Sequence, residues 1–568
     1  MSMPRRRSYA LFSCLALLIL FFSPTFLPAQ VYSGNPKLIV IVVIDQFRGD
    51  YLNRFHSEFK GRGFRLFTDE GAWFTNCYYD YANTKTAPGH ATIGTGAYSD
   101  GHGIETNEWW DTSRDAHHKI SSVEDERYQL VDVPSNVIPA NLPNAQPSAL
   151  KYLIGSSPRN LRATTLGDEL RLATQGKARV FGVSLKDRAS ILPSGQSANA
   201  AYWLEPASGQ FTTSTYYMEH LPEWVHAFNA SDRRQRAAHE ALADGTDQFF
   251  EQVGRMPAAN SYELDFAQAL IQNEHLGQNG VTDEITISLS ANDIEGHAFG
   301  PDSPQEHRMV LGLDHDLDAF FTWLDKTVGL KNVWLALSAD HGVAPVPSEA
   351  AQLGISAVAV NMTEIDAAIN TKLNERFSPG SETQYLMPDP DLPYITLNKQ
   401  AFEQAKVDEK TAEDAVAALV QEAVAASAPQ PKSELPLQHR LPPAPRVQAV
   451  YTRLQLAHSE LPPSEWGRRI AHSYADHGNW FVMAMLDAYQ IQGSGAGGTT
   501  HYSPWSYDRH VPLAFYGAPF APGEYRERVA PVDLAATFAS LAGVNQPSAS
   551  VGRVLTEALK PTATAAIK

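Results

Sequence analysis

The sequence predicts an α/β protein built on a doubly wound, mostly parallel sheet that carries inserted α+β cap segments. Three observations support this prediction. Short, nearly continuous apolar runs have the length and β-branched content of buried parallel strands. Segments able to form helices lie between them, and this alternation is typical of a doubly wound sheet. Aspartate and histidine residues follow closely after several runs, where such sheets bind their ligands.

Four apolar runs are the candidate strands. They are Leu38–Ile44, Ile285–Ser290, Val333–Ser338 and Val511–Tyr516, and a helix is expected over Glu306–Leu324. Because the carboxyl ends of parallel strands meet at one edge of a sheet, residues that are distant in the sequence can converge there on one site.

Two stretches are predicted to be insertions into this sheet, at about 345–500 and about 195–265. The first contains a candidate strand at Tyr394–Leu397 and a helix whose apolar face lies within 415–424. A proline-rich linker follows at 429–445. A chain of 568 residues exceeds one ordinary core, so one large domain with insertions, or two domains, is expected.

The N-terminus has the features of an export signal over residues 1–29. Arg5, Arg6 and Arg7 precede an apolar stretch at 10–22 that is too short for a comfortable membrane span, and Ala29 offers a cleavage point. We therefore expect a periplasmic or secreted bacterial protein with no stable membrane span after removal of the signal.

The number of cysteines and the net charge further restrict the class of protein. Cys14 lies in the signal, so the mature chain keeps only Cys77, which cannot form an internal disulfide and is expected to be buried. The formal net charge of -18 argues against a nucleic-acid-binding surface.

Five short strings carry the candidate chemistry. Each alone is a weak signal, but they occur in order and each lies next to a predicted strand or helix end. With His90 set aside, they offer three aspartates and three histidines, a mixture that suits zinc. The strings are Val43–Asp45, Asn83–His90, Asp293–His297, Ser338–Gly342 and Gly498–Pro504.

Other histidines have simpler interpretations. Asp476-His477-Gly478 follows a helix-like segment rather than a buried strand, and we interpret it as a decoy. His90, His102, His315 and His472 are interpreted as capping, core or surface residues.

Together the five strings resemble the alkaline phosphatase superfamily, and most closely the phosphate-irrepressible alkaline phosphatases of bacteria, which are related to the nucleotide pyrophosphatase/phosphodiesterases. The resemblance runs from about residue 36 to about 545 and implies an alkaline phosphatase-like catalytic domain at 30–568. It also implies two zinc ions per chain. Asp45, Thr86, Asp340 and His341 would surround one ion, and Asp293, His297 and His501 the other. Tyr502 stands where the family usually has glycine.

The resemblance also implies three residues that meet the substrate phosphate: Asn107, Lys186 and Arg188. Lys186 and Arg188 match a basic pair of the monoesterases. Spaced by two after an apolar run, they can point to one face of an extended segment. A terminal phosphate carries more negative charge than a diester, which suits an arginine fork beside a lysine charge.

The expected reaction is hydrolysis of phosphate monoesters of small molecules by a monomer. Thr86 precedes Pro88 and a segment that can open a helix, where free N–H groups favour an anion. The hypothesis is in-line attack by Thr86 on phosphorus, a phosphothreonine intermediate, and its hydrolysis by metal-activated water, which releases inorganic phosphate.

Three alternatives remain. A phosphodiesterase or nucleotide pyrophosphatase would use the same site, and Trp109 and Trp110 could stack a base. A sulfatase is disfavoured, because that class needs a modified Cys or Ser where Thr86 stands and an arginine where His90 stands. A catalytically inactive, zinc-stabilised binding protein is disfavoured by the intact threonine.

Overall fold

A mixed sheet forms the centre of the structure, which is a computed structural model describing residues 34–115, 118–133, 154–242, 249–427, 444–493 and 497–561. Within these residues the sheet has nine strands in the order β18-β2-β17-β11-β1-β10-β7-β8-β9. The described residues from Asn35 onward form one compact unit. The strands are β1 (Leu38–Ile44), β2 (Ala72–Phe74), β7 (Val180–Ser184), β8 (Ala200–Glu205), β9 (Gln210–Thr212), β10 (Asp283–Leu289), β11 (Val333–Ser338), β17 (Leu513–Tyr516) and β18 (Gly523–Tyr525).

The central strands β11, β1, β10, β7 and β8 are parallel, as the sequence predicts. Every residue of β1, β10 and β11 is buried, which explains their nearly continuous apolar runs. The exception among the four predicted strands is β17, which pairs antiparallel with β11. Strand β1 lies between β10 and β11, so the strand order reverses at β1. In sheets of this kind a crevice opens at the carboxyl ends of the strands beside that point.

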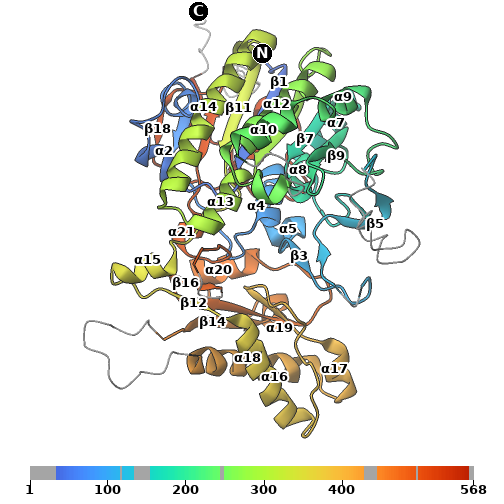
Figure 1. Cartoon of the computed structure of the whole chain (residues 1–568), viewed down its shortest axis with the longest axis vertical. Coiled ribbons are helices and arrows are strands. Elements are labelled where there is room, and N and C mark those ends of the chain that lie inside the picture. The colour runs from blue at the N-terminus through green and yellow to red at the C-terminus, as the bar shows by residue number, and fades with distance from the viewer. Residues whose placement is uncertain are drawn as a thin grey trace, which may run out of the picture. The chain divides into compact units, whose positions relative to one another are not determined.

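Helices connect and cover these strands (Figure 1). The helix α4 packs on α8 and α22, while α12 packs on α14, β7 and β10. The helix predicted over 306–324 is longer, because Ser303 caps it and Pro304 suits its first turn. The bounds are α4 (Thr86–Thr95), α8 (Asp187–Ser194), α12 (Pro257–Asn273), α13 (Ala291–Phe299), α14 (Pro304–Thr327) and α22 (Val532–Ala542).

The stretch at 345–500 has small sheets and an apolar core of its own. Strand β12 (Val358–Val360) pairs with β16 (Gln490–Gln492), and a second sheet has the order β13-β15-β14. Apolar side chains of its helices α16, α17 and α18 belong to that core, and Figure 1 shows these helices beside one another in the inserted segment. The remaining bounds are β13 (Tyr394–Thr396), β14 (Val447–Thr452), β15 (Phe481–Leu486), α16 (Met362–Phe377), α17 (Lys399–Gln404) and α18 (Glu409–Ala426).

The stretch at 195–265 is arranged differently, because its strands β8 and β9 extend one edge of the main sheet. The domain boundaries themselves stay a prediction. The signal at 1–29, Cys14 and most of the proline-rich linker lie outside the described residues. Cys77 is buried and unpaired. None of the helices in the described ranges combines the length and apolar character needed to cross a bilayer.

Candidate metal centre

Asp45, Asp340 and His341 form one group of potential metal ligands at the carboxyl ends of β1 and β11. Parallel pairing of these strands brings the three residues together. The Nε2 atom of His341 lies 3.5 Å from Asp45 Oδ1 and 3.4 Å from Asp340 Oδ2. Its Nδ1 lies 3.0 Å from the carbonyl oxygen of Gly342, to which it donates. That hydrogen bond leaves Nε2 as the atom that can bind a metal.

These residues fit a metal ion because their facing atoms lack other partners. Asp45 Oδ1, Asp340 Oδ2 and His341 Nε2 are buried without a hydrogen-bond partner among the described residues. Burial and the charge of Asp45 raise the pKa of Asp340 well above its usual range, and burial lowers the pKa of His341. Burying such groups is costly, and a divalent cation would satisfy all three at once.

Asp293, His297 and His501 form a second group. Asp293 and His297 lie one turn apart on α13, with His297 Nε2 3.2 Å from Asp293 Oδ1. The Nε2 atom of His501 lies 3.6 Å from the same oxygen. The Nδ1 atoms of His297 and His501 donate to the carbonyl oxygens of Thr499 and Thr84, at 2.8 and 2.6 Å. Both imidazoles therefore present Nε2 to the centre of the group.

The two groups adjoin, and Lys186 lies between them. The ring centroids of His341 and His501 are 3.6 Å apart. The ammonium of Lys186 donates to Asp45 Oδ2 and to Asp293 Oδ2, each at 2.6 Å. Burial opposes its charge, but Asp293 and Asp45 raise the pKa of Lys186 overall. Lys186 is therefore a fixed positive charge that touches both groups.

Thr86 is the first residue of α4 and is 2% exposed. The start of this helix adjoins the first ligand group through Gly89. A Cβ atom on Gly89 would lie only 2.3 Å from the carbonyl oxygen of Asp340, so a larger residue would push α4 away. Thr86 therefore stands at the start of a helix that packs directly against Asp340, a member of the first ligand group.

Asn107 contacts the start of α4, whereas Arg188 lies at the start of α8. The Oδ1 atom of Asn107 accepts the N–H of Ala87, the second residue of α4, at 2.8 Å. Lys186 and Arg188 do not lie on one extended segment as expected, because α8 begins at Asp187. Lys186 is its extended N-cap, and Arg188 is in its first turn. The Nε atom of Arg188 is buried and has no hydrogen-bond partner in the described ranges.

Gln46 is a site residue that sequence reasoning missed. Its N–H donates to Asp340 Oδ1 at 3.0 Å, and its Nε2 donates to Asp293 Oδ1 at 2.6 Å. It therefore contacts one ligand of each group. A Cβ atom on Gly296 would lie 2.0 Å from Gln46 Oε1, so that glycine admits the amide. Its position directly after Asp45 was the only signal available.

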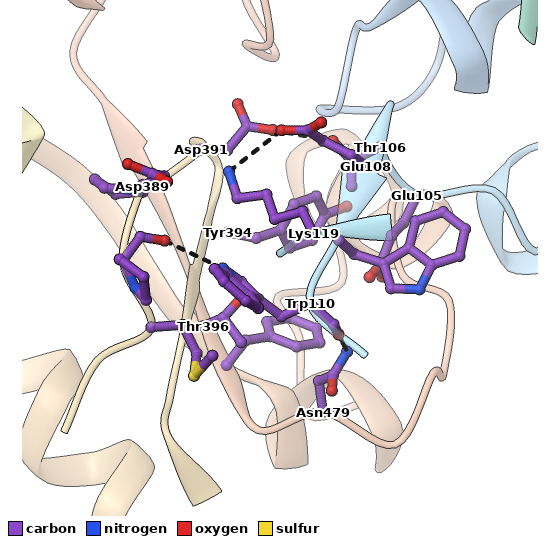
Figure 2. Close-up of a pocket in the computed structure, with 15 residues that line it drawn as sticks. Glu105, Thr106, Glu108, Trp110, Lys119, Asp389, Asp391, Tyr394, Thr396 and Asn479 are labelled. Atoms are coloured by element: carbon purple, nitrogen blue, oxygen red, sulfur yellow. Dashed lines mark hydrogen bonds and ion pairs between the residues drawn. The ribbon is translucent and has the colours of Figure 1, made fainter. Parts of the chain in front are cut away.

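A pocket lined by Thr106 and Glu108, the chain neighbours of Asn107, is also lined by residues of the 345–500 segment (Figure 2). Trp109 and Trp110 line it but are only 6% and 5% exposed. Trp109 stacks on His477, with centroids 4.4 Å apart. The Trp110 indole donates to the carbonyl oxygen of Pro388 at 3.1 Å. The two tryptophans are thus occupied by protein contacts, which weakens the suggestion that they stack a base.

His90, His102, His315 and His472 are not members of either ligand group, although His90 Nδ1 lies 3.3 Å from Asp340 Oδ2. His90 Nε2 is 2.6 Å from Ser288 Oγ, and burial lowers the pKa of His90 to about 4. His102 Nε2 is 3.2 Å from Thr92 Oγ1. His472 stacks on Tyr98, and the His315 side chain is exposed. Their contacts agree with capping, core and surface roles.

The fold is that of the alkaline phosphatase superfamily, and the two groups of potential ligands fit a metal-dependent hydrolase of that class. Within it, the chain belongs to the type I phosphodiesterase / nucleotide pyrophosphatase family, whose model matches residues 39–493. This confirms the predicted resemblance.

Relatives of known name match almost the full length. The chain is 32% identical to alkaline phosphatase PhoV of Synechococcus elongatus, covering 96% of this chain and 99% of the relative. It is 31% identical to alkaline phosphatase PafA of Elizabethkingia meningoseptica, covering 92% and 95%. A crystal structure of PafA superposes with a TM-score of 0.78 at 28% identity, covering 93% of this chain and 99% of that structure. This match confirms the predicted fold.

Proposed function

We propose that this protein is an alkaline phosphatase that hydrolyses phosphate monoesters of small molecules. The observation that carries the proposal is the convergence of two adjacent ligand groups with Thr86, at the start of α4. The names of the full-length relatives support it. Buried carboxylates and imidazoles without thiolates favour zinc, one ion in each group. When bound, the ions supply positive charge for the phosphate oxygens and lower the pKa of a coordinated hydroxyl.

The residues of this chain have distinct roles in the proposed reaction. The Thr86 oxygen attacks phosphorus in line as the bond from phosphorus to the ester oxygen breaks, and the alcohol leaves with a proton. Water then hydrolyses the phosphothreonine, which releases inorganic phosphate and restores the Thr86 hydroxyl. Asn107, held at the start of α4 by Ala87, donates to a phosphoryl oxygen through its side-chain amide. Arg188 donates to phosphoryl oxygens, and Lys186 adds charge beside them while it also holds Asp45 and Asp293. Catalysis is then mainly positioning and electrostatic stabilisation.

Replacing the nucleophile tests the proposal directly. Thr86→Ala should abolish turnover of an aryl phosphate monoester, because no other hydroxyl takes its place. The metal content should stay close to that of the unmodified protein, since both ligand groups keep their acidic and imidazole side chains. Activity and bound metal are measured on the same preparation. Near-normal turnover would rule out Thr86 as the nucleophile.

The basic pair tests monoester preference. Lys186→Ala with Arg188→Ala should lower kcat/KM for a monoester much more than for a diester, because a monoester carries the extra charge. Arg188→Ala alone is the informative comparison, since Lys186 also bonds two ligand carboxylates. Equal losses on the two ester types would favour the phosphodiesterase alternative.

Export and assembly belong to the same proposal. The arginines and apolar stretch at the N-terminus support export to the periplasm or medium. A monomer is expected, and light scattering measures the molar mass in solution that tests this.

A further inference from the structure

Asp391 joins the inserted segment to both sides of the proposed phosphate site. Its Oδ1 lies 2.5 Å from the ammonium of Lys85, and its Oδ2 accepts from Thr106 Oγ1 at 3.3 Å. Lys85 directly precedes Thr86, and Thr106 directly precedes Asn107. One carboxylate therefore holds the neighbour of the proposed nucleophile and the neighbour of the proposed phosphate ligand.

Both partners of Asp391 are buried, whereas the Asp391 side chain itself is 35% exposed. Lys85 and Thr106 are each 4% exposed. Removing the Asp391 carboxylate would leave the buried Lys85 ammonium without its charged partner, which is unfavourable. Figure 2 shows Asp391 beside Thr106 and Glu108, whereas Asp389 of the same segment lies apart from them. The inserted segment thus contacts the residues next to Thr86 and Asn107 through Asp391.

The backbone around Asp391 is held by Gln492. The Nε2 atom of Gln492 donates to the carbonyl oxygen of Pro390 at 2.6 Å, and its Oε1 accepts the N–H of Leu392 at 3.0 Å. The side chain therefore fixes the residue on each side of Asp391. The N–H of Gln492 in turn donates to the hydroxyl of Tyr502.

Tyr502 links this support to the metal centre. It follows His501, and its φ of 122° lies in a region that favours glycine. A tyrosine there is strained, and such strain persists where surrounding contacts hold it. Its ring centroid lies 5.9 Å from the Lys85 ammonium, and its N–H donates to Thr84 Oγ1 at 3.2 Å. The residue that departs from the family's glycine therefore contacts both Gln492 and Lys85.

We propose that Asp391 is a positioning residue of the active site. By binding Lys85 and Thr106 together, it fixes Thr86 relative to Asn107. The inference rests on the proposed function, because it assigns Asp391 to the same reaction. The inserted segment is then required for full turnover even though its small sheets lie outside the nine-stranded sheet.

The test compares two aspartates of one segment in the full-length, metal-loaded protein. Asp391→Asn should lower kcat/KM for an aryl phosphate monoester roughly 10- to 100-fold, mostly through kcat, because small misplacements of reacting groups have effects of that size. Metal content should stay unchanged. Asp389→Asn, an exposed residue that lines the same pocket, is the matched control and should leave activity unchanged.

A double-mutant cycle separates positioning from general destabilisation. Lys85→Met should lower kcat similarly, and the Lys85→Met, Asp391→Asn double variant should be no worse than either single variant, since both remove one interaction. Thr106→Val, which keeps the ion pair, should give a smaller loss of kcat. Additive losses, activity of Asp391→Asn within about twofold of the unmodified protein, or a loss of metal would overturn the proposal. Activity that survives Thr86→Ala would instead overturn the proposed function.

Discussion

Hydrogen bonds from neighbouring residues hold the proposed metal ligands in place. The imidazoles of His341, His297 and His501 each donate Nδ1–H to a backbone carbonyl. Gln46 differs because it contacts both groups. Its backbone N–H donates to Asp340, and its side-chain amide donates to Asp293. Partners of this kind orient ligands and tune metal affinity. Gln46 therefore couples the geometry of the two groups.

Gln46→Ala should weaken metal binding at the Asp293 group roughly 10- to 100-fold, the usual effect of losing such a partner. Competition with a chelator of known affinity measures it. Gly296→Ala should have a similar effect, because its Cβ would displace the Gln46 amide. Gln352→Ala, at an exposed position in the described structure, is the control. Unchanged metal affinity in the first two variants would contradict this role.

At the scale of one element, strand β10 contains a buried carboxyl away from the site. Glu284 is 0% exposed, and neither of its side-chain oxygens has a hydrogen-bond partner within the described ranges. Burial raises the pKa of Glu284 to about 8 from the ordinary value of 4.5. Between these values the folded protein holds a proton that the unfolded chain releases. This group therefore lowers stability as pH rises through that window, and adds no further loss above it.

Glu284→Gln should remove this pH dependence, because the amide stays neutral. The free energy of unfolding of the unmodified protein should fall relative to the variant by at most about 1.4 kcal/mol per pH unit across the window. Denaturant unfolding near pH 5 and near pH 8 measures the difference between the two proteins. A constant difference at both pH values would show that folding does not shift the pKa of Glu284.

At the scale of the whole molecule, the ligand groups connect segments far apart in the chain. They join the ends of β1 and β11, the helix α13 and the loop that holds His501. Without a cation, buried acidic groups from these different segments face one another. Metal binding should therefore stabilise the complete fold and not only the site.

Removal of metal by a chelator should lower the melting temperature of the protein and abolish activity together. Added zinc should restore both, and the melting temperature should rise with zinc concentration, as expected for a ligand that binds only the folded state. Thr86→Ala, inactive but with both groups intact, should show the same thermal shift. A melting temperature that is unchanged after verified metal removal would contradict this coupling.

Much of the fold, and the candidate ligands that the structure groups together, could be predicted from the sequence. Strands β1 and β11 are apolar along their whole length because both faces are buried, and that pattern is local. Asp45 and Asp340 were recognised as candidates because they end such runs, and parallel pairing then brings them together. The pattern of residues along short stretches of the chain was sufficient for these predictions.

Only the tertiary structure decided which groups meet across the chain. Lys85 and Asp391 are 306 residues apart, and no short pattern marks their contact. Gln46 shows no motif, and the position of Lys186 between two carboxylates depends on where α8 begins. The sequence allowed Trp109 and Trp110 to stack a base. In the structure, packing against His477 and Pro388 occupies both side chains. Strand patterns are set by neighbours in the chain, whereas these contacts are set by how distant segments pack.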